Sequence, residues 1–233
     1  MMKSFIEREN EIFDILDSFN KAGLKNVLIG GYAVSAYTHR FSVDADVCIA
    51  KDNLHYFKEI LRAKHFVLVK RRDLEDVYKG AFECYTKKTK LPVTVDLMIG
   101  SIVSRQTNAS ISFNQLYTNS IIKKITGIEK EITARIPNKE LLIALKIHSA
   151  RLTDARDIVA LCHNIDFDAV AKFMHTGNAK EVQSNLDNLL ASGLDNLPVL
   201  TASITLFVNI KKLPINRMTL RWRISLLNIC GGR

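Results

Sequence analysis

The seven residues from Val43 to Ile49, Val-Asp-Ala-Asp-Val-Cys-Ile, constrain the fold more than any other part of the chain. Their alternating pattern is typical of a β-strand with one face in the core. It places Asp44, Asp46 and Cys48 on one face and the valines, alanine and isoleucine on the other. Two carboxylates on the same face can converge on hard divalent cations, so this strand is a candidate metal-binding element.

A short strand and a glycine pair precede this segment. The residues from Asn26 to Ile29 are largely apolar and are followed by Gly30-Gly31, which predicts a buried strand that breaks into a tight loop. A helix is expected to begin at Tyr32. Because glycine has no Cβ atom, backbone N–H groups here can approach phosphate oxygens, helped by the positive end of that helix. Arg40 and Ser42 follow, where they could bind phosphate or an incoming substrate.

A third carboxylate occurs in a later strand-like segment. Asp96 is the only charged residue from Pro92 to Ile99. An unpaired carboxylate is costly to bury, and a metal ion is one of the few partners that offsets the cost. Asp44, Asp46 and Asp96 are therefore predicted to hold two divalent cations about 3.5–4 Å apart, with Mg²⁺ expected and Mn²⁺ an alternative. The competing interpretation is that these aspartates simply face solvent.

The remaining patterns predict an α+β fold in two parts. A catalytic α/β domain with a mixed sheet is expected over residues 1–137, and a helical domain with a basic C-terminal tail over 138–233. In the first domain, helices are predicted over 5–22 and 52–64, strands over 66–70, 81–86 and 92–99, and a β pair over 121–136. In the second, helices are predicted over 139–149, 168–173 and 179–191.

Composition narrows the classes of function. The chain has 33 Lys+Arg and 24 Asp+Glu, a net charge of +9. This charge favours a polyanionic partner such as RNA, DNA or a nucleoside triphosphate, although many proteins are basic without such a partner.

Four widely spaced cysteines lack the intervals of zinc or redox motifs and are expected to be reduced. The apolar stretch 199–210 is shorter than the roughly 20 residues that a membrane span needs. With no signal peptide apparent, a cytoplasmic protein is expected.

The glycine pair, the twelve residues that separate it from Asp44-x-Asp46, and the later Asp96 together resemble the nucleotidyltransferase superfamily with the DNA polymerase beta-like fold. More narrowly, Arg40-x-Ser42-x-Asp44-x-Asp46 resembles the AbiEii group, the nucleotidyltransferase toxins of certain toxin–antitoxin systems. A later segment with Lys146, Arg151, Asp154 and Asp157 is similar to the helical signature of that group. The resemblance implies that Lys146 contacts the triphosphate and that Asp157 or Asp154 positions the triphosphate or the lysine.

The resemblance implies a magnesium-dependent enzyme that transfers a nucleoside monophosphate from a nucleoside triphosphate to an acceptor hydroxyl, with Asp96 as the base. The acceptor could be tRNA or another nucleic acid, a protein side chain or a small molecule, and an antitoxin protein could be a partner. Two alternatives are a catalytically silent binding module and a metal-dependent phosphohydrolase.

Several residues of this prediction have structural alternatives. Lys146 could instead be a surface lysine. Arg151, Asp154, Arg156 and Asp157 could instead be capping and ion-pair residues near the start of a helix that Thr153 caps. His39 is a weaker candidate for a substrate contact, and His148 is expected to be structural.

Overall fold

A computed structural model describes residues 2–38, 40–73 and 80–191. The chain divides into two compact units. Of the described residues, the first comprises those up to 103 and from 110 to 138, and the second comprises 104–109 and 139–191. The short segment 104–109 groups with the later helices rather than with the strands that flank it in sequence. The predicted basic tail lies outside the described residues.

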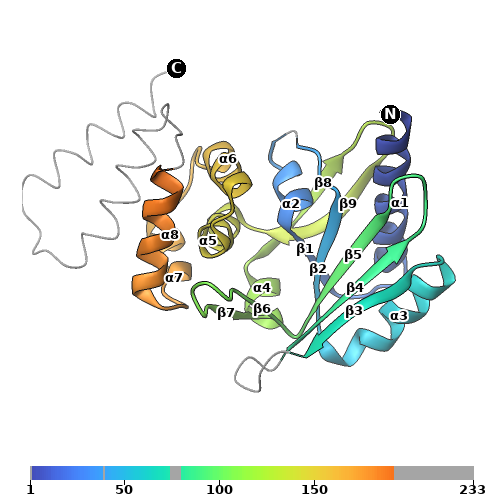
Figure 1. The fold of residues 1–233 in the computed structure, drawn as a ribbon, viewed down its shortest axis with the longest axis horizontal. Helices are drawn as coiled ribbons and strands as arrows, with labels where there is room; N and C mark the ends of the chain where they lie inside the picture. Colours follow the sequence, from blue (N-terminus) through green and yellow to red (C-terminus); the bar gives the residue numbers. More distant parts are fainter. Residues whose placement is uncertain (1, 39, 74–79, 192–233) are drawn as a thin grey trace, which may run out of the picture. The chain divides into compact units, whose positions relative to one another are not determined.

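The first unit is built around a five-stranded mixed sheet (Figure 1). Its strands are β1 (Asn26–Ile29), β2 (Asp44–Ile49), β3 (Val67–Asp73), β4 (Ala81–Lys87) and β5 (Val93–Ile99). The strand order is β1-β2-β5-β4-β3. Strands β2 and β5 run parallel, and the other neighbouring pairs are antiparallel. The prediction of an α+β fold with a mixed sheet is confirmed.

Helices and two small hairpins complete the first unit. Their bounds are α1 (Met2–Lys21), α2 (Gly30–Ser35), a 3₁₀ turn (Lys51–Asn53), α3 (Leu54–Ala63), β6 (Ser101–Val103), β7 (Ser110–Ser112), α4 (Phe113–Thr118), β8 (Ser120–Thr126) and β9 (Glu131–Pro137). The elements between Ser101 and Thr118 were not predicted, because each is too short to show a periodic pattern. The one local signal there is the capping box at the start of α4, in which Ser112 and Gln115 bond reciprocally.

The two faces of the sheet differ in burial. Along β5, the residues Val93, Val95, Leu97 and Ile99 are buried, whereas the residues between them are half-buried. Helix α1 contacts β5 and also α3, where the Phe19 and Phe57 rings pack edge to face at 4.8 Å. The apolar face of the sheet therefore forms the core, and the other face carries the polar residues.

Two glycines in the left-handed backbone region shape the start of this unit. Gly23 has a φ of +67° and lies just beyond Lys21, the last residue of α1. Gly30 has a φ of +66° at the junction of β1 and α2. The space around them differs: a Cβ atom at Gly23 would meet nothing within 4 Å, whereas one at Gly30 would overlap Asp46 Oδ2 and lie 2.9 Å from its Cγ. The absence of a side chain at Gly30 lets Asp46 occupy its position.

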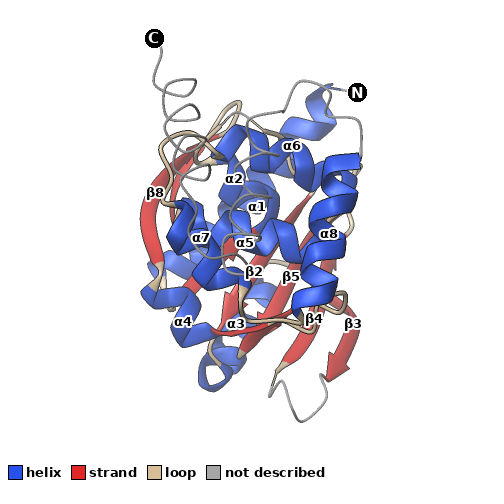
Figure 2. Cartoon of the chain, turned by 90° about the vertical axis from the view of Figure 1, so that its left-hand side faces the viewer, coloured by secondary structure: helices blue, strands red, loops and turns tan. Residues whose placement is uncertain are grey.

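The described secondary structure of the second unit consists of helices (Figure 2). These are α5 (Lys139–Ser149), α6 (Leu152–Leu161), α7 (Phe167–Met174) and α8 (Ala179–Ala191), in agreement with the helical pattern predicted from residue 139. Across both units, the described part of the chain contains no helix that combines the length and the apolar character needed to span a membrane.

A buried ionic cluster joins α5 to α6. Lys146 is 3% exposed, and its Nζ atom lies 2.8 Å from both Asp154 Oδ1 and Asp157 Oδ2. Asp154 Oδ2 accepts hydrogen bonds from the Ser149 hydroxyl and from the backbone N–H of Arg151. Burial alone would raise the pKa of Asp154, but Lys146, Ser149 and Arg151 together hold it below its ordinary value. The alternative that Lys146 is a surface lysine is wrong.

We expect Gly30→Ala to destabilise the protein more than Gly23→Ala. Both changes force a side chain into the left-handed region, which costs about 1–2 kcal/mol. Gly30→Ala must also displace the Asp46 carboxylate, whereas the added methyl group at Gly23 points into open space. Urea unfolding of the two variants measures the difference, and equal losses of stability would contradict the close approach.

Lys146→Met is expected to lower the free energy of unfolding by about 3–5 kcal/mol, because it leaves two buried carboxylates without a counter-charge. Lys130→Met is the matched control: Lys130 pairs with Asp14 at the surface, and this change should cost less than about 1 kcal/mol. Chemical denaturation of both variants tests this. If the two variants are equally stable, the cluster does not hold the helices together.

Candidate metal centre

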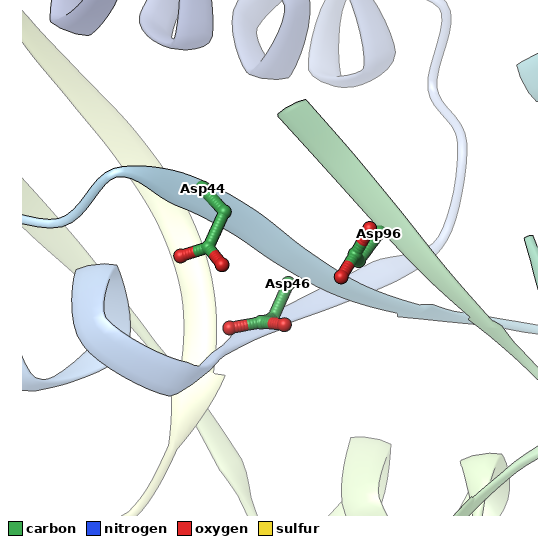
Figure 3. A group of neighbouring side chains, drawn as sticks. All are labelled: Asp44, Asp46 and Asp96. Carbon is green, nitrogen blue, oxygen red and sulfur yellow. The ribbon is translucent and has the colours of Figure 1, made fainter. Parts of the chain in front are cut away.

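Three carboxylates converge on the half-buried face of the sheet (Figure 3). Asp44 and Asp46 come from β2 and Asp96 from the adjacent β5. One oxygen from each lies within 4.8 Å of the others. The described residues contain no other group of three histidine, cysteine or acidic side chains with this geometry.

The convergence follows from strand geometry and register. Alternation along β2 puts Asp44 and Asp46 on one face, with Ala45 buried between them on the other. In the parallel pair of β2 and β5, Asp46 lies opposite Asp96, and neighbouring residues in register project from the same face. The shared face of Asp44 and Asp46 was predicted from the sequence. The position of Asp96 beside them follows from the register of β2 and β5.

The site fits the chemistry of a hard divalent cation. Asp96 Oδ1 is buried and has no hydrogen-bond partner within the described structure. Such an oxygen is costly unless a cation binds it, and carboxylate oxygens are the ligands that Mg²⁺ and Mn²⁺ prefer. Burial, supported by the charge of Asp44, raises the pKa of Asp96, and the Cys84 thiol and Lys70 oppose this rise. The three carboxylates can therefore hold a divalent metal ion.

Cys84 is a neighbour of this site that was expected only to be a reduced thiol. It lies opposite Asp96 in the antiparallel pair of β4 and β5, so its thiol and the Asp96 carboxylate project from the same face of the sheet. Burial and this carboxylate raise the pKa of Cys84 to about 12, so the thiol is protonated at neutral pH. Alternation in the sequence places Cys84 on a strand but does not reveal which residue lies across from it.

The predicted phosphate-binding residues surround the two aspartates of β2. Gly30 lies against Asp46, and a Cβ atom at Gly31 would overlap the Ser42 side chain and lie 3.5 Å from Arg40 Cζ. Ser42 Oγ lies 3.3 Å from the backbone oxygen of Asp44. The structure thus brings both glycines, Arg40 and Ser42 together beside the carboxylates.

The remaining predicted residues lie in the second unit or outside the described chain. Lys146 and Asp157 belong to the buried cluster of α5 and α6. The prediction that α6 is capped by Thr153 is wrong: the N-cap is Arg151, because its backbone N–H bonds to Asp154 and the helix begins at Leu152. His39 is outside the described residues.

His148 fits the structural role expected of it. It is buried in the second unit, and its Nδ1 lies 2.8 Å from the Thr107 hydroxyl. Burial lowers its pKa, which favours the neutral ring.

Comparison with known proteins identifies the fold. No family model matches the sequence, and no curated protein sequence matches it. Among solved structures, the antibiotic-resistance factor ANT(2'')-Ia matches with a TM-score of 0.50 at 12% identity, covering 75% of this chain and 91% of that one. A nucleotidyltransferase-like protein from Paracoccidioides brasiliensis matches with a TM-score of 0.49 at 16% identity, covering 85% and 92%.

The lincosamide antibiotic adenylyltransferase LnuA is a further match, with a TM-score of 0.44 at 19% identity, covering 66% of this chain and 95% of that one. At these identities the likeness concerns the fold alone. It rests on the match to ANT(2'')-Ia, which has a TM-score of 0.50. The chain therefore shares the fold of the antibiotic-resistance factor ANT(2'')-Ia, and three aspartates that can hold a divalent cation lie on its central strands.

Proposed function

We propose that this protein is a magnesium-dependent nucleotidyltransferase that transfers a nucleoside monophosphate from a nucleoside triphosphate to an acceptor hydroxyl. The observation that carries the proposal is the convergence of Asp44, Asp46 and Asp96 on a half-buried sheet face, with one Asp96 oxygen unpartnered in the described structure. Carboxylates held this close repel one another, and a divalent cation between them relieves the repulsion. Mn²⁺ has the same ligand preference and could replace Mg²⁺.

Each part of the proposed site has a role in the transfer. The three carboxylates would hold divalent cations, which neutralise charge on the phosphates and on the attacking and leaving oxygens. The glycine pair offers backbone N–H groups to the β- and γ-phosphates. Arg40 and Ser42, beside Gly31, add a guanidinium and a hydroxyl for phosphate oxygens.

The reaction is an in-line displacement at the α-phosphorus. The acceptor oxygen forms a bond to phosphorus, the bond from phosphorus to the oxygen that bridges the α- and β-phosphates breaks, and pyrophosphate leaves with the electron pair. The hydroxyl proton would pass to the Asp96 carboxylate, which lies on the strand next to Asp44 and Asp46.

The AbiEii resemblance extends the proposal to a toxin that an antitoxin protein neutralises. Its support is the Arg40-x-Ser42-x-Asp44-x-Asp46 segment and the later group around Lys146. A direct contact between Lys146 and the triphosphate would have to replace at least one of the two buried ion pairs that Lys146 makes. Positioning of Lys146 by Asp154 and Asp157 is the part of this resemblance that the contacts support.

Asp44→Asn with Asp46→Asn is expected to reduce nucleotidyl transfer by at least about a hundredfold. The reason is that the cations that stabilise the charge of the transition state lose two carboxylate ligands. The measurement is transfer of label from each of the four α-labelled ribonucleoside triphosphates to total RNA, total protein and small-molecule extracts, with and without Mg²⁺. Asp14→Asn with Asp17→Asn is the matched control, since it makes the same charge change at exposed sites on α1.

Magnesium-dependent labelling by the wild type and by the control, lost in the Asp44/Asp46 variant, would support the proposal and identify the donor and the acceptor class. Wild-type protein that labels none of the three pools, and whose melting temperature does not respond to triphosphate with Mg²⁺, would favour a silent binding module instead. Release of inorganic phosphate without transfer would favour a phosphohydrolase.

A further inference from the structure

The half-buried sheet face continues beyond the carboxylates to the edge strand β3. In the register of the sheet, Asp96 lies opposite Cys84 of β4, and Cys84 lies opposite Lys70 of β3. The next such row contains Phe82 opposite Arg72. Residues opposite each other in register project from the same face, so both cations share the face of the metal centre.

An irregularity in β3 produces this arrangement. Leu68 pairs with Tyr85 but Lys70 pairs with Cys84, so Val69 is an extra residue in the strand. Without it, Val69 would lie opposite Cys84, and Lys70 would project from the core face. The shift instead sends Lys70 and Arg72 to the face of the carboxylates. Such bulges commonly redirect side chains beside active sites.

The two cations are available to a ligand. Both are exposed, and no ion pair or hydrogen bond to either is found among the described residues. Arg71, which points to the core face, differs because it pairs with Glu83 at 3.3 Å and with Asp73 at 3.1 Å. The positive charge of Lys70 also acts on Asp96 and opposes the rise of its pKa. Within the described residues, the metal centre is therefore bordered by two cationic side chains that make no ion pair.

The geometry of in-line transfer indicates that the acceptor binds over β4 and β3. In the proposed function, on which this inference rests, pyrophosphate leaves near Gly30-Gly31, at the end of β1. The attacking oxygen must approach the α-phosphorus from the opposite side. Because the strand order is β1-β2-β5-β4-β3, that side lies over β4 and β3, where Lys70 and Arg72 project.

We propose that the acceptor is the 3′ end of a single-stranded RNA, bound over β4 and β3 with its backbone phosphates contacting Lys70 and Arg72. An acceptor with a phosphate backbone matches two cations next to a metal centre, whereas a polycationic small molecule would be repelled by them. Phe82, half-buried and opposite Arg72, offers an aromatic ring on which a base can stack. The net charge of +9 favours the same partner.

The test compares Lys70→Glu with Arg72→Glu, made together, against Arg62→Glu with Lys64→Glu. The control makes the same charge change at two exposed residues, at the end of α3 and just after it. Binding of a fluorescent single-stranded oligoribonucleotide with a free 3′ hydroxyl is measured by anisotropy at several salt concentrations. Transfer to that oligonucleotide and stabilisation by triphosphate with Mg²⁺ are measured alongside.

The Lys70/Arg72 variant should bind the oligonucleotide at least about tenfold more weakly. The slope of log K against log salt should fall by about 1.4, or about 0.7 for each phosphate that is no longer neutralised. Its stabilisation by triphosphate should be unchanged, and Lys70→Arg with Arg72→Lys should retain binding. The control should bind and react like the wild type.

Equal RNA affinity in the two charge-reversal variants would overturn the inference, as would transfer to a protein or small molecule that does not depend on Lys70 and Arg72. Those results leave the proposed function intact if transfer itself occurs. Conversely, RNA binding that depends on Lys70 and Arg72, with no transfer by the wild type, would overturn the proposed function and keep the RNA surface.

Discussion

The parallel pairing of β2 with β5 is the constraint on which the metal centre depends. It places Asp46 directly opposite Asp96, while alternation within β2 adds Asp44 to the same face. Three carboxylates with oxygens within 4.8 Å of one another repel, and burial adds to the cost at Asp96. A divalent cation between them would remove both penalties, which is why the geometry favours metal binding. Gly30 belongs to the same arrangement, because a side chain there would displace Asp46.

Two acidic clusters of the protein differ in how their charge is balanced. In the second unit, Asp154 and Asp157 share Lys146, and this internal cation makes the cluster part of the helical core. In the first unit, Asp44, Asp46 and Asp96 are only half-buried, and one Asp96 oxygen has no hydrogen-bond partner in the described structure. We therefore expect the first-unit cluster to bind cations from solution and the second-unit cluster to stabilise the fold.

The sequence predicted what depends on local pattern. Alternation in β2 was enough to place Asp44 and Asp46 on one face, and the glycine pair marked the break between β1 and α2. The register that brings Asp96 to them depends on tertiary pairing, which a single sequence does not encode in any local period. For the same reason the positions of Cys84 and Lys70 were missed: the extra residue in β3 reverses the face that alternation would assign. Lys146 was recognised as important, but its burial depends on Asp154 and Asp157 folding back from the next helix.

The central claim is that Asp44, Asp46 and Asp96 together bind a divalent cation. The most direct measurement is an electron paramagnetic resonance titration with Mn²⁺, in the presence of a non-hydrolysable triphosphate analogue, on the wild type, Asp96→Asn and the surface control Asp14→Asn. We expect saturable Mn²⁺ binding by the wild type and by Asp14→Asn, and at least about tenfold weaker binding by Asp96→Asn, which loses one charged ligand. Equal Mn²⁺ affinity in all three proteins, or no binding by the wild type, would contradict the claim.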